Sequence, residues 1–235
     1  MRIVSFSDDF SGDVLDSAWI VNGDGGSLDA ANDVFQIIND RSGGGGGTDL
    51  SRFGGVIDAD GDGSVGSFSS SITVTLEEFS NPSTGAYFKW KFFGPGSFTE
   101  IVLNSFGRMQ MLHGYPGGES GYIQDNPDIG LTGFGDLLTL SLLYDAGSDT
   151  IDVLYSLNGG EDVSFHSGGG IYGPVGDLAS WLVVAEVFPF NVEGPPYITS
   201  VQIQEWSMTA IPKPSAAGAI PEPSAAGAIP EPSAA

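Results

Sequence analysis

The chain has 235 residues, no cysteine, and 30 acidic against 7 basic side chains, which give a formal net charge of −23 at pH 7. That charge excludes nucleic acid and anionic lipid as partners, and the missing thiols exclude disulfides and thiolate metal sites. The 36 glycines and 14 prolines, without any apolar pattern of helical period, predict short strands joined by tight turns and little helix. No apolar stretch is long enough for a membrane-spanning helix, so no membrane insertion is expected.

An acidic loop is the first chemical motif along the chain. Asp58, Asp60 and Asp62 stand at alternate positions and are followed by Gly63. Carboxylates at this spacing, with glycine for the turn, match the first half of a calcium-binding loop. The bidentate glutamate that would close such a loop is missing, because its position is Ser69. The motif predicts a Ca²⁺ site completed by oxygen ligands from elsewhere; the alternative is a solvated acidic turn.

Two strands with alternating side chains are predicted next. Apolar and hydroxyl side chains alternate over residues 68–77, the pattern of a half-buried strand. In the following run Phe88, Trp90 and Phe92 share one face, which we predict to belong to the core rather than to a sugar-binding platform. The turn residues at 81–85 predict that these two strands pair directly as part of a meander.

The opposite face of the second strand carries a candidate ligand site. Tyr87, Lys89 and Lys91 alternate with the aromatic core residues, and the two lysines are among only 7 basic residues in the chain. An aromatic ring flanked by ammonium groups is suited to binding an acidic sugar or a carboxylate-rich neighbour. The alternative is that the lysines only balance nearby acidic side chains.

Further strands follow, and together they predict the fold class. Asn158-Gly159-Gly160 predicts a hairpin turn between two of the runs. About ten to twelve short antiparallel strands predict an all-β, two-sheet β-sandwich or jelly roll over residues 1–209. The predicted runs are 101–105, 108–113, 137–145, 150–157, 161–166, 181–188 and 198–208.

Candidate catalytic residues are few. Glu186 stands among apolar neighbours, but the sequence offers no second carboxylate beside it to act as its partner. The two histidines, His113 and His166, are 53 positions apart and are expected at the surface or at strand edges. The sequence therefore predicts a protein that is not an enzyme. The alternative is a glycoside hydrolase or lyase with an atypical acid pair.

The last 26 residues, 210–235, form a separate segment with a nine-residue repeat, Ile-Pro-Lys/Glu-Pro-Ser-Ala-Ala-Gly-Ala. Two prolines in each unit prevent helix and central strand, which leaves polyproline II. Nine residues are about three turns of that helix, so Ile211, Ile220 and Ile229 are predicted to recur on one edge about 28 Å apart. The spacing predicts an attachment segment that docks on neighbouring subunits; the alternative is a flexible spacer.

Two resemblances accompany these patterns. The opening Phe6-Ser-Asp-Asp-Phe-Ser-Gly12, with Leu15-Asp16 and Trp19, resembles the start of concanavalin A-like lectin and glucanase jelly rolls. The resemblance implies the same sandwich for most of residues 3–208. The repeated Ile-Pro-Glu-Pro-Ser-Ala resembles the Pro-Glu-Pro sorting signal of exported bacterial proteins, but no membrane helix or arginine cluster follows it here.

The combined expectation is a non-catalytic, lectin-like structural or adhesion module. It is expected to bind a surface glycan, if it binds a ligand, and to be held by its tail in an oligomer or lattice. A virion decoration or fibre protein and an exported bacterial surface protein both fit, so the expected location is an extracellular or a virion surface.

Overall fold

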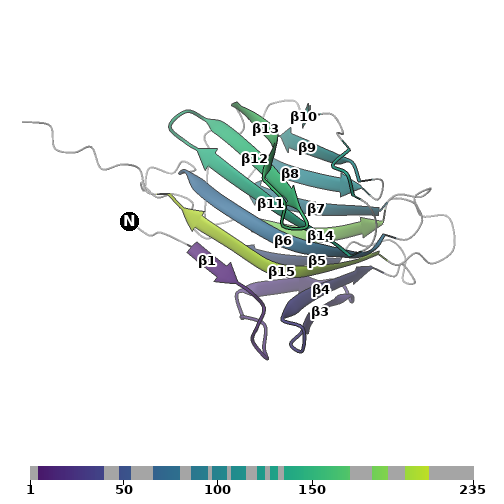
Figure 1. Ribbon diagram of the computed structural model, residues 1–235. Coiled ribbons are helices and arrows are strands. Elements are labelled where there is room, and N and C mark those ends of the chain that lie inside the picture. The colour runs from purple at the N-terminus through teal and green to yellow at the C-terminus, as the bar shows by residue number, and fades with distance from the viewer. Residues whose placement is uncertain are drawn as a thin grey trace, which may run out of the picture.

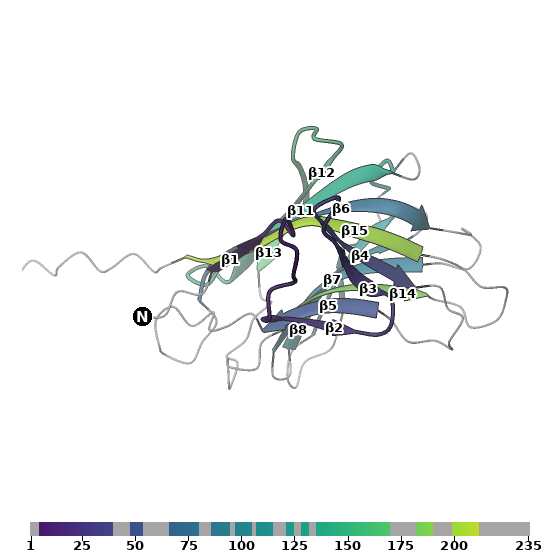
Figure 2. The same ribbon diagram turned by 90° about the horizontal axis from the view of Figure 1, so that it is seen from below.

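The computed structural model describes residues 5–39, 48–53, 66–79, 86–94, 97–104, 107–114, 121–124, 128–131, 135–169, 182–189 and 199–211. Within these ranges the chain forms fifteen strands and no helix, arranged as two antiparallel sheets packed face to face (Figures 1 and 2). The predicted all-β sandwich is therefore confirmed. The structure also contains no helix of the length and apolar character needed to cross a membrane within the described ranges.

One sheet has eight strands, in the order β13-β12-β11-β6-β15-β4-β3, and β1 pairs with the part of β15 that β4 leaves free. Its central strands are the long β6 and β15, which are hydrogen-bonded to each other along most of their length. The strands of this sheet are β1 Ser5–Asp8, β3 Gly26–Asp29, β4 Val34–Asn39, β6 Phe68–Phe79, β11 Asp136–Asp145, β12 Thr150–Leu157, β13 Val163–Gly169 and β15 Thr199–Ala210.

The other sheet has seven strands, in the order β10-β9-β8-β7-β14-β5-β2. Its centre is β7, which pairs with β8 on one side and with β14 on the other. The strands are β2 Trp19–Asn22, β5 Thr48–Phe53, β7 Ala86–Gly94, β8 Ser97–Asn104, β9 Met109–Gly114, β10 Gly121–Gln124 and β14 Leu182–Pro189.

The prediction that the strand over residues 68–77 pairs with the following strand, which contains Phe88, Trp90 and Phe92, is wrong. β6 lies in the eight-stranded sheet and β7 in the seven-stranded sheet. The two strands face each other across the core instead, where the rings of Phe68 and Phe92 lie 5.7 Å apart. Alternation fixes which face of a strand is apolar, but it does not distinguish a partner beside the strand from one opposite it.

The aromatic side chains of the N-terminal segment close one end of the core. Trp19 packs edge-on against Phe6 with ring centroids 5.5 Å apart and lies 5.1 Å from Trp206 of β15. The indole N–H of Trp19 donates to Asp8 Oδ2 at 2.6 Å, so its polar atom is satisfied at the core boundary. The residues that carry the resemblance to lectin jelly rolls therefore have a packing role.

Two local predictions have direct counterparts in the structure. β12 and β13 form the expected antiparallel hairpin, joined by residues 158–162. Asn158 and Gly159 both have positive φ, and Gly160 N donates to Leu157 O at 2.9 Å, so the predicted residues make a tight turn within this longer connection. β15 ends at Ala210, next to the predicted start of the tail. The division of the chain into 1–209 and 210–235 stays a prediction, since residues 212–235 lie outside the described ranges.

Candidate functional site

The candidate ligand site lies on the outer face of the seven-stranded sheet, at its centre. Alternation along β7 places Phe88, Trp90 and Phe92 in the core, where all three are fully buried, as predicted. Tyr87 and Lys89 therefore lie on the outer face with Lys91, and all three side chains are partly exposed. The structure thus places the three predicted residues on one surface, two positions apart along a single strand.

The neighbouring strands bring carboxylates to this surface. In the register of β7 with β14, Lys89 is the Cα partner of Glu186, and in the register with β8, Lys91 is the partner of Glu100. On the far side of β14, Asp49 of β5 is the partner of Glu186. We call these five residues the charged cluster. It contains two ammonium groups and three carboxylates on one sheet face.

An ion pair forms the middle of the charged cluster. Lys91 Nζ contacts Glu186 Oε2, and the two side chains are only 12% and 14% exposed. Burial lowers the pKa of Lys91 to about 8 from its usual 10.5, and the charge of Lys89 acts in the same direction, whereas Glu100 and Asp49 raise it. Oxygen acceptors brought by a ligand would favour the charged form of this lysine.

The register also supplies the carboxylate partner for Glu186 that the sequence did not show. Residues directly opposite on neighbouring strands have Cβ atoms roughly 4.5–5.5 Å apart, which places the side chains of Asp49 and Glu186 close together. Both are already engaged: Glu186 pairs with Lys91, and Asp49 accepts a hydrogen bond from Asn22 Nδ2 at 2.8 Å. Each of the two carboxylates therefore already has a partner of its own in this structure.

The predicted calcium ligands cannot be placed. Asp58, Asp60 and Asp62 lie outside the described residues, in the stretch of sequence between β5 and β6. Within the described ranges, no group of three or more histidine, aspartate or glutamate side chains is arranged to hold a metal ion. The calcium site therefore stays a prediction from the sequence.

The two histidines are closer in space than their separation along the chain suggested. Burial lowers the pKa of His166 on β13; Asp152 opposes this shift, and the positive charge of His113 on β9 adds to it. Neither side chain is fully exposed, and His166 Nε2 is buried with no hydrogen-bond partner among the described residues. The sequence predicted both histidines at the surface or at strand edges, and β13 is indeed an edge strand. The interaction between His113 and His166 joins strands of opposite sheets, which the sequence did not show.

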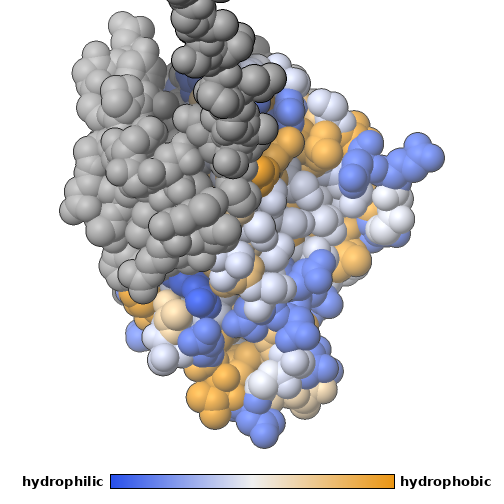
Figure 3. Space-filling view, turned by 90° about the vertical axis from the view of Figure 1, so that its left-hand side faces the viewer, coloured by the Kyte–Doolittle hydropathy of each residue, from blue (hydrophilic) through white to orange (hydrophobic). Residues whose placement is uncertain are grey.

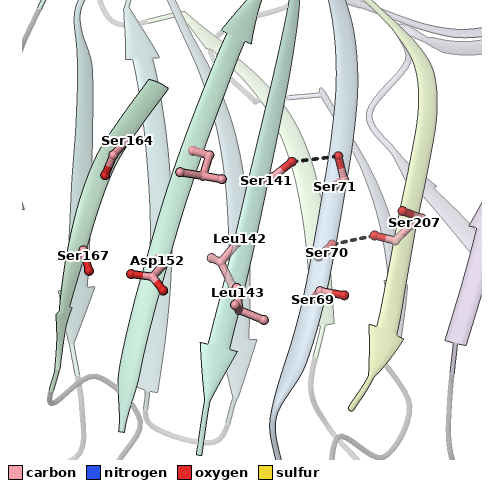
Figure 4. Close-up of a pocket in the computed structure, with 11 residues that line it drawn as sticks. Ser69, Ser70, Ser71, Ser141, Leu142, Leu143, Asp152, Ser164, Ser167 and Ser207 are labelled. Atoms are coloured by element: carbon pink, nitrogen blue, oxygen red, sulfur yellow. Dashed lines mark hydrogen bonds between the residues drawn. The ribbon is translucent and has the colours of Figure 1, made fainter. Parts of the chain in front are cut away.

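A second surface feature lies on the eight-stranded sheet (Figure 4). It is an open hollow with a volume of about 470 Å³, lined by seven serines, three leucines and Asp152. We call it the serine groove. Ser71 and Ser141 share a hydrogen bond between their hydroxyls at 3.2 Å, and Ser70 Oγ donates to Ser207 O at 2.7 Å. The sequence showed the hydroxyl face of β6 but not the strands that complete the groove.

Comparison with known proteins identifies the fold. No protein-family model and no curated protein sequence matches the chain. Among solved structures, the CBM2 module of the evolved Dit protein of Lactobacillus casei BL23 phage J-1 is similar at 13% identity and a TM-score of 0.62, over 92% of this chain and 100% of that module. Arcelin-5, a lectin-like defence protein from Phaseolus vulgaris, is similar at 12% identity and a TM-score of 0.62, over 90% of this chain and 99% of arcelin-5.

A third similar structure is the lectin UEA-II in complex with galactose, at 13% identity and a TM-score of 0.60, over 88% of this chain and 98% of the lectin. The similarity extends over nearly the whole length of each of these proteins. The sandwich is therefore a concanavalin A-like jelly roll, as the opening residues of the sequence implied.

Proposed function

We propose that this concanavalin A-like sandwich is a non-catalytic, lectin-like module that binds a glycan at the charged cluster and is attached by its tail to a larger assembly. The observation that carries the proposal is the charged cluster itself, beside Tyr87 and at the centre of one sheet face. Lectins and a carbohydrate-binding module with the same fold support it. Fold alone does not determine function, so the argument depends on the chemistry of the cluster.

The charged cluster suits a ligand rich in hydroxyl groups. Lysine ammonium groups donate hydrogen bonds and carboxylates accept them, so a sugar hydroxyl can bridge Lys89 and Glu186. Tyr87 supplies an aromatic ring for the apolar side of a sugar. Three carboxylates beside two lysines, on a chain with a net charge of −23, favour a neutral glycan over the acidic sugar that the sequence suggested.

Attachment by the repeated tail completes the proposed role. Ile211, Ile220 and Ile229 would dock at regular intervals on neighbouring subunits, and the loop with Asp58, Asp60 and Asp62 would bind Ca²⁺. The assembly is either a virion, on which the chain is a decoration or fibre protein, or a bacterial surface that carries it as an exported protein. Both place the protein on an extracellular or virion surface.

Binding to a panel of neutral and acidic glycans tests the role of the charged cluster. Lys89→Met keeps the length of the side chain but removes one donor, and we expect it to weaken binding about tenfold, the effect of losing one charge-assisted hydrogen bond. Arg108→Met is the matched control, because Arg108 is exposed and is not part of the cluster. Equal affinities for the wild type and Lys89→Met would refute the assignment of the site.

The alternative function is polysaccharide hydrolysis by an atypical acid pair, and the position of Asp49 opposite Glu186 is the observation in its favour. The carboxyl groups of retaining glycosidases are about 5–5.5 Å apart. We expect no release of reducing sugar from a panel of β-glucans. Release that is lost in Glu186→Gln would replace the binding role with a catalytic one.

A further inference from the structure

The serine groove crosses five neighbouring strands. Its lining runs from Ser207 on β15, across β6, β11 and β12, to Ser164 on β13 (Figure 4). Strands lie about 4.8 Å apart, so four spacings give a length of about 19 Å. Leu143 is 42% exposed within this lining, which is high for an apolar side chain on a sheet surface. The groove therefore offers both hydroxyl groups and apolar contact.

The described chain ends beside this groove. Ile211 N donates to Ser67 O at 2.7 Å, which holds the start of the tail against the strand end that carries Ser69 of the groove. Ser67 is in turn fixed to the end of β11, because its hydroxyl accepts from Ala146 N at 2.9 Å. Figure 3 views this end of the sandwich, where polar and apolar side chains are mixed on the described surface. Another 24 residues follow Ile211.

The first repeat of the tail has the chemistry to fill the groove. A polyproline II segment has no internal hydrogen bonds, and Pro212 and Pro214 have no backbone N–H, so the segment presents more carbonyl acceptors than N–H donors. Serine hydroxyls are donors that can satisfy them. One nine-residue unit is about 28 Å long, enough to cross the groove of about 19 Å.

Charge distinguishes the first repeat from the others. Its third residue is Lys213, whereas the second and third repeats have Glu222 and Glu231 at this position. Asp152 lines the groove, and Asp145 lies beside the exit of the tail, where Ser67 Oγ donates to it at 3.4 Å. These carboxylates attract a lysine and repel a glutamate. The single basic repeat is therefore the one that stands next to an acidic surface.

We infer that the first repeat, residues 211–219, lies in the serine groove of its own chain. It acts as a strap that fixes the base of the tail. Of the three isoleucines proposed to dock on neighbouring subunits, Ile211 then stays with its own chain, and the repeats of Ile220 and Ile229 are left to attach to other subunits. Only the role of those two outer repeats rests on the proposed function. The strap itself is a property of the isolated chain.

Cysteine labelling tests the strap, because the natural chain contains no cysteine. Ser164→Cys places a thiol in the groove with little change in size, and Ser27→Cys places one at an exposed site on β3, at the opposite edge of the same sheet. Each is made in the full chain, in the full chain with Lys213→Glu, and in a chain that lacks residues 212–235. The rate of reaction with a maleimide is measured at several protein concentrations.

We expect Ser164→Cys to react about tenfold more slowly in the full chain than in the chain without 212–235, which corresponds to a groove occupied about 90% of the time. Lys213→Glu should restore most of the rate, and Ser27→Cys should react equally in all three chains. Equal rates for Ser164→Cys in all chains would overturn the inference, as would protection that survives Lys213→Glu. Protection that grows with protein concentration would place a second copy's tail in the groove and also overturn it.

The test separates the two proposals, since it needs neither a glycan nor the larger assembly. If labelling shows that the groove is free while the tail is still required for assembly, the strap is refuted and the proposed attachment stands.

Discussion

Removing Lys91 should destabilise the protein more than removing its partner Glu186. Lys91→Met leaves three carboxylates of the charged cluster with only Lys89 to balance them, whereas Glu186→Gln leaves Lys91 with Glu100 and Asp49 on the same face. The two side chains of the ion pair are 12% and 14% exposed, so water screens the remaining charges poorly. The order of the two effects therefore follows from the neighbours of the pair.

Breaking a buried ion pair by removing one partner typically costs about 3–5 kcal/mol. For Lys91→Met we expect about 3 kcal/mol, the low end of that range, because both side chains retain some exposure. For Glu186→Gln we expect about half that cost, since two carboxylates still face Lys91. At about 2–4 °C per kcal/mol for a domain of this size, Lys91→Met should lower the melting temperature by about 6–12 °C.

Urea unfolding and thermal melts of both single variants and of the double variant provide the measurement. The pair of Arg52 and Asp16, in which the Asp16 side chain is 52% exposed, is the internal control: Asp16→Asn should leave the melting temperature unchanged, because Asp16 is solvated and the amide oxygen still accepts from Ala18 N. Losses below about 1 kcal/mol for both variants would mean that solvent screens the pair, and a larger loss for Glu186→Gln would refute the reasoning from neighbouring charges.

Three further predictions concern metal, tail and pH. Calcium should raise the melting temperature of the wild type and not that of Asp60→Ala; identical melts in calcium and in chelator would remove the proposed site. Deleting residues 212–235 should leave the sandwich folded but prevent cosedimentation with the parent assembly, and serine at both Ile220 and Ile229 should weaken cosedimentation nearly as much; full retention would make the tail a linker. Burial and the nearby His113 lower the pKa of His166 from its usual 6.5, while Asp152 opposes them. As the pH falls below 6.5, the unfolded chain therefore binds a proton at this histidine before the folded protein does, and the free energy of unfolding decreases. His166→Gln should flatten the fall in the free energy of unfolding between pH 7.5 and 5.5, and an unchanged slope would contradict the shift.

The sequence by itself determined the class of the fold and the two faces of its long strands. In β7 the alternation of aromatic and polar residues was enough to assign Trp90 to the core and Lys91 to the surface, because successive side chains of a strand point to opposite sides. The turn at Asn158-Gly159 was equally local, since these residue types tolerate the positive φ that the hairpin requires.

The sequence patterns did not predict the short strands before residue 54. β3, Gly26–Asp29, is a four-residue edge strand with one large apolar residue, and its pairing depends on β4 beside it rather than on its own pattern. Such segments become strands because a neighbouring strand offers unpaired backbone groups, which is a tertiary effect.

Only the tertiary structure decided which strands lie side by side, and therefore which side chains form the sites. Glu186 meets Lys91 across 95 positions of sequence, and Ser207 meets Ser70 across 137. Strand patterns carry no information on such pairings, because any strand with one apolar face can pair beside another or pack opposite it. The charged cluster and the serine groove both arise from register between distant strands, whereas the tail motif and the aspartate loop are local and visible in the sequence.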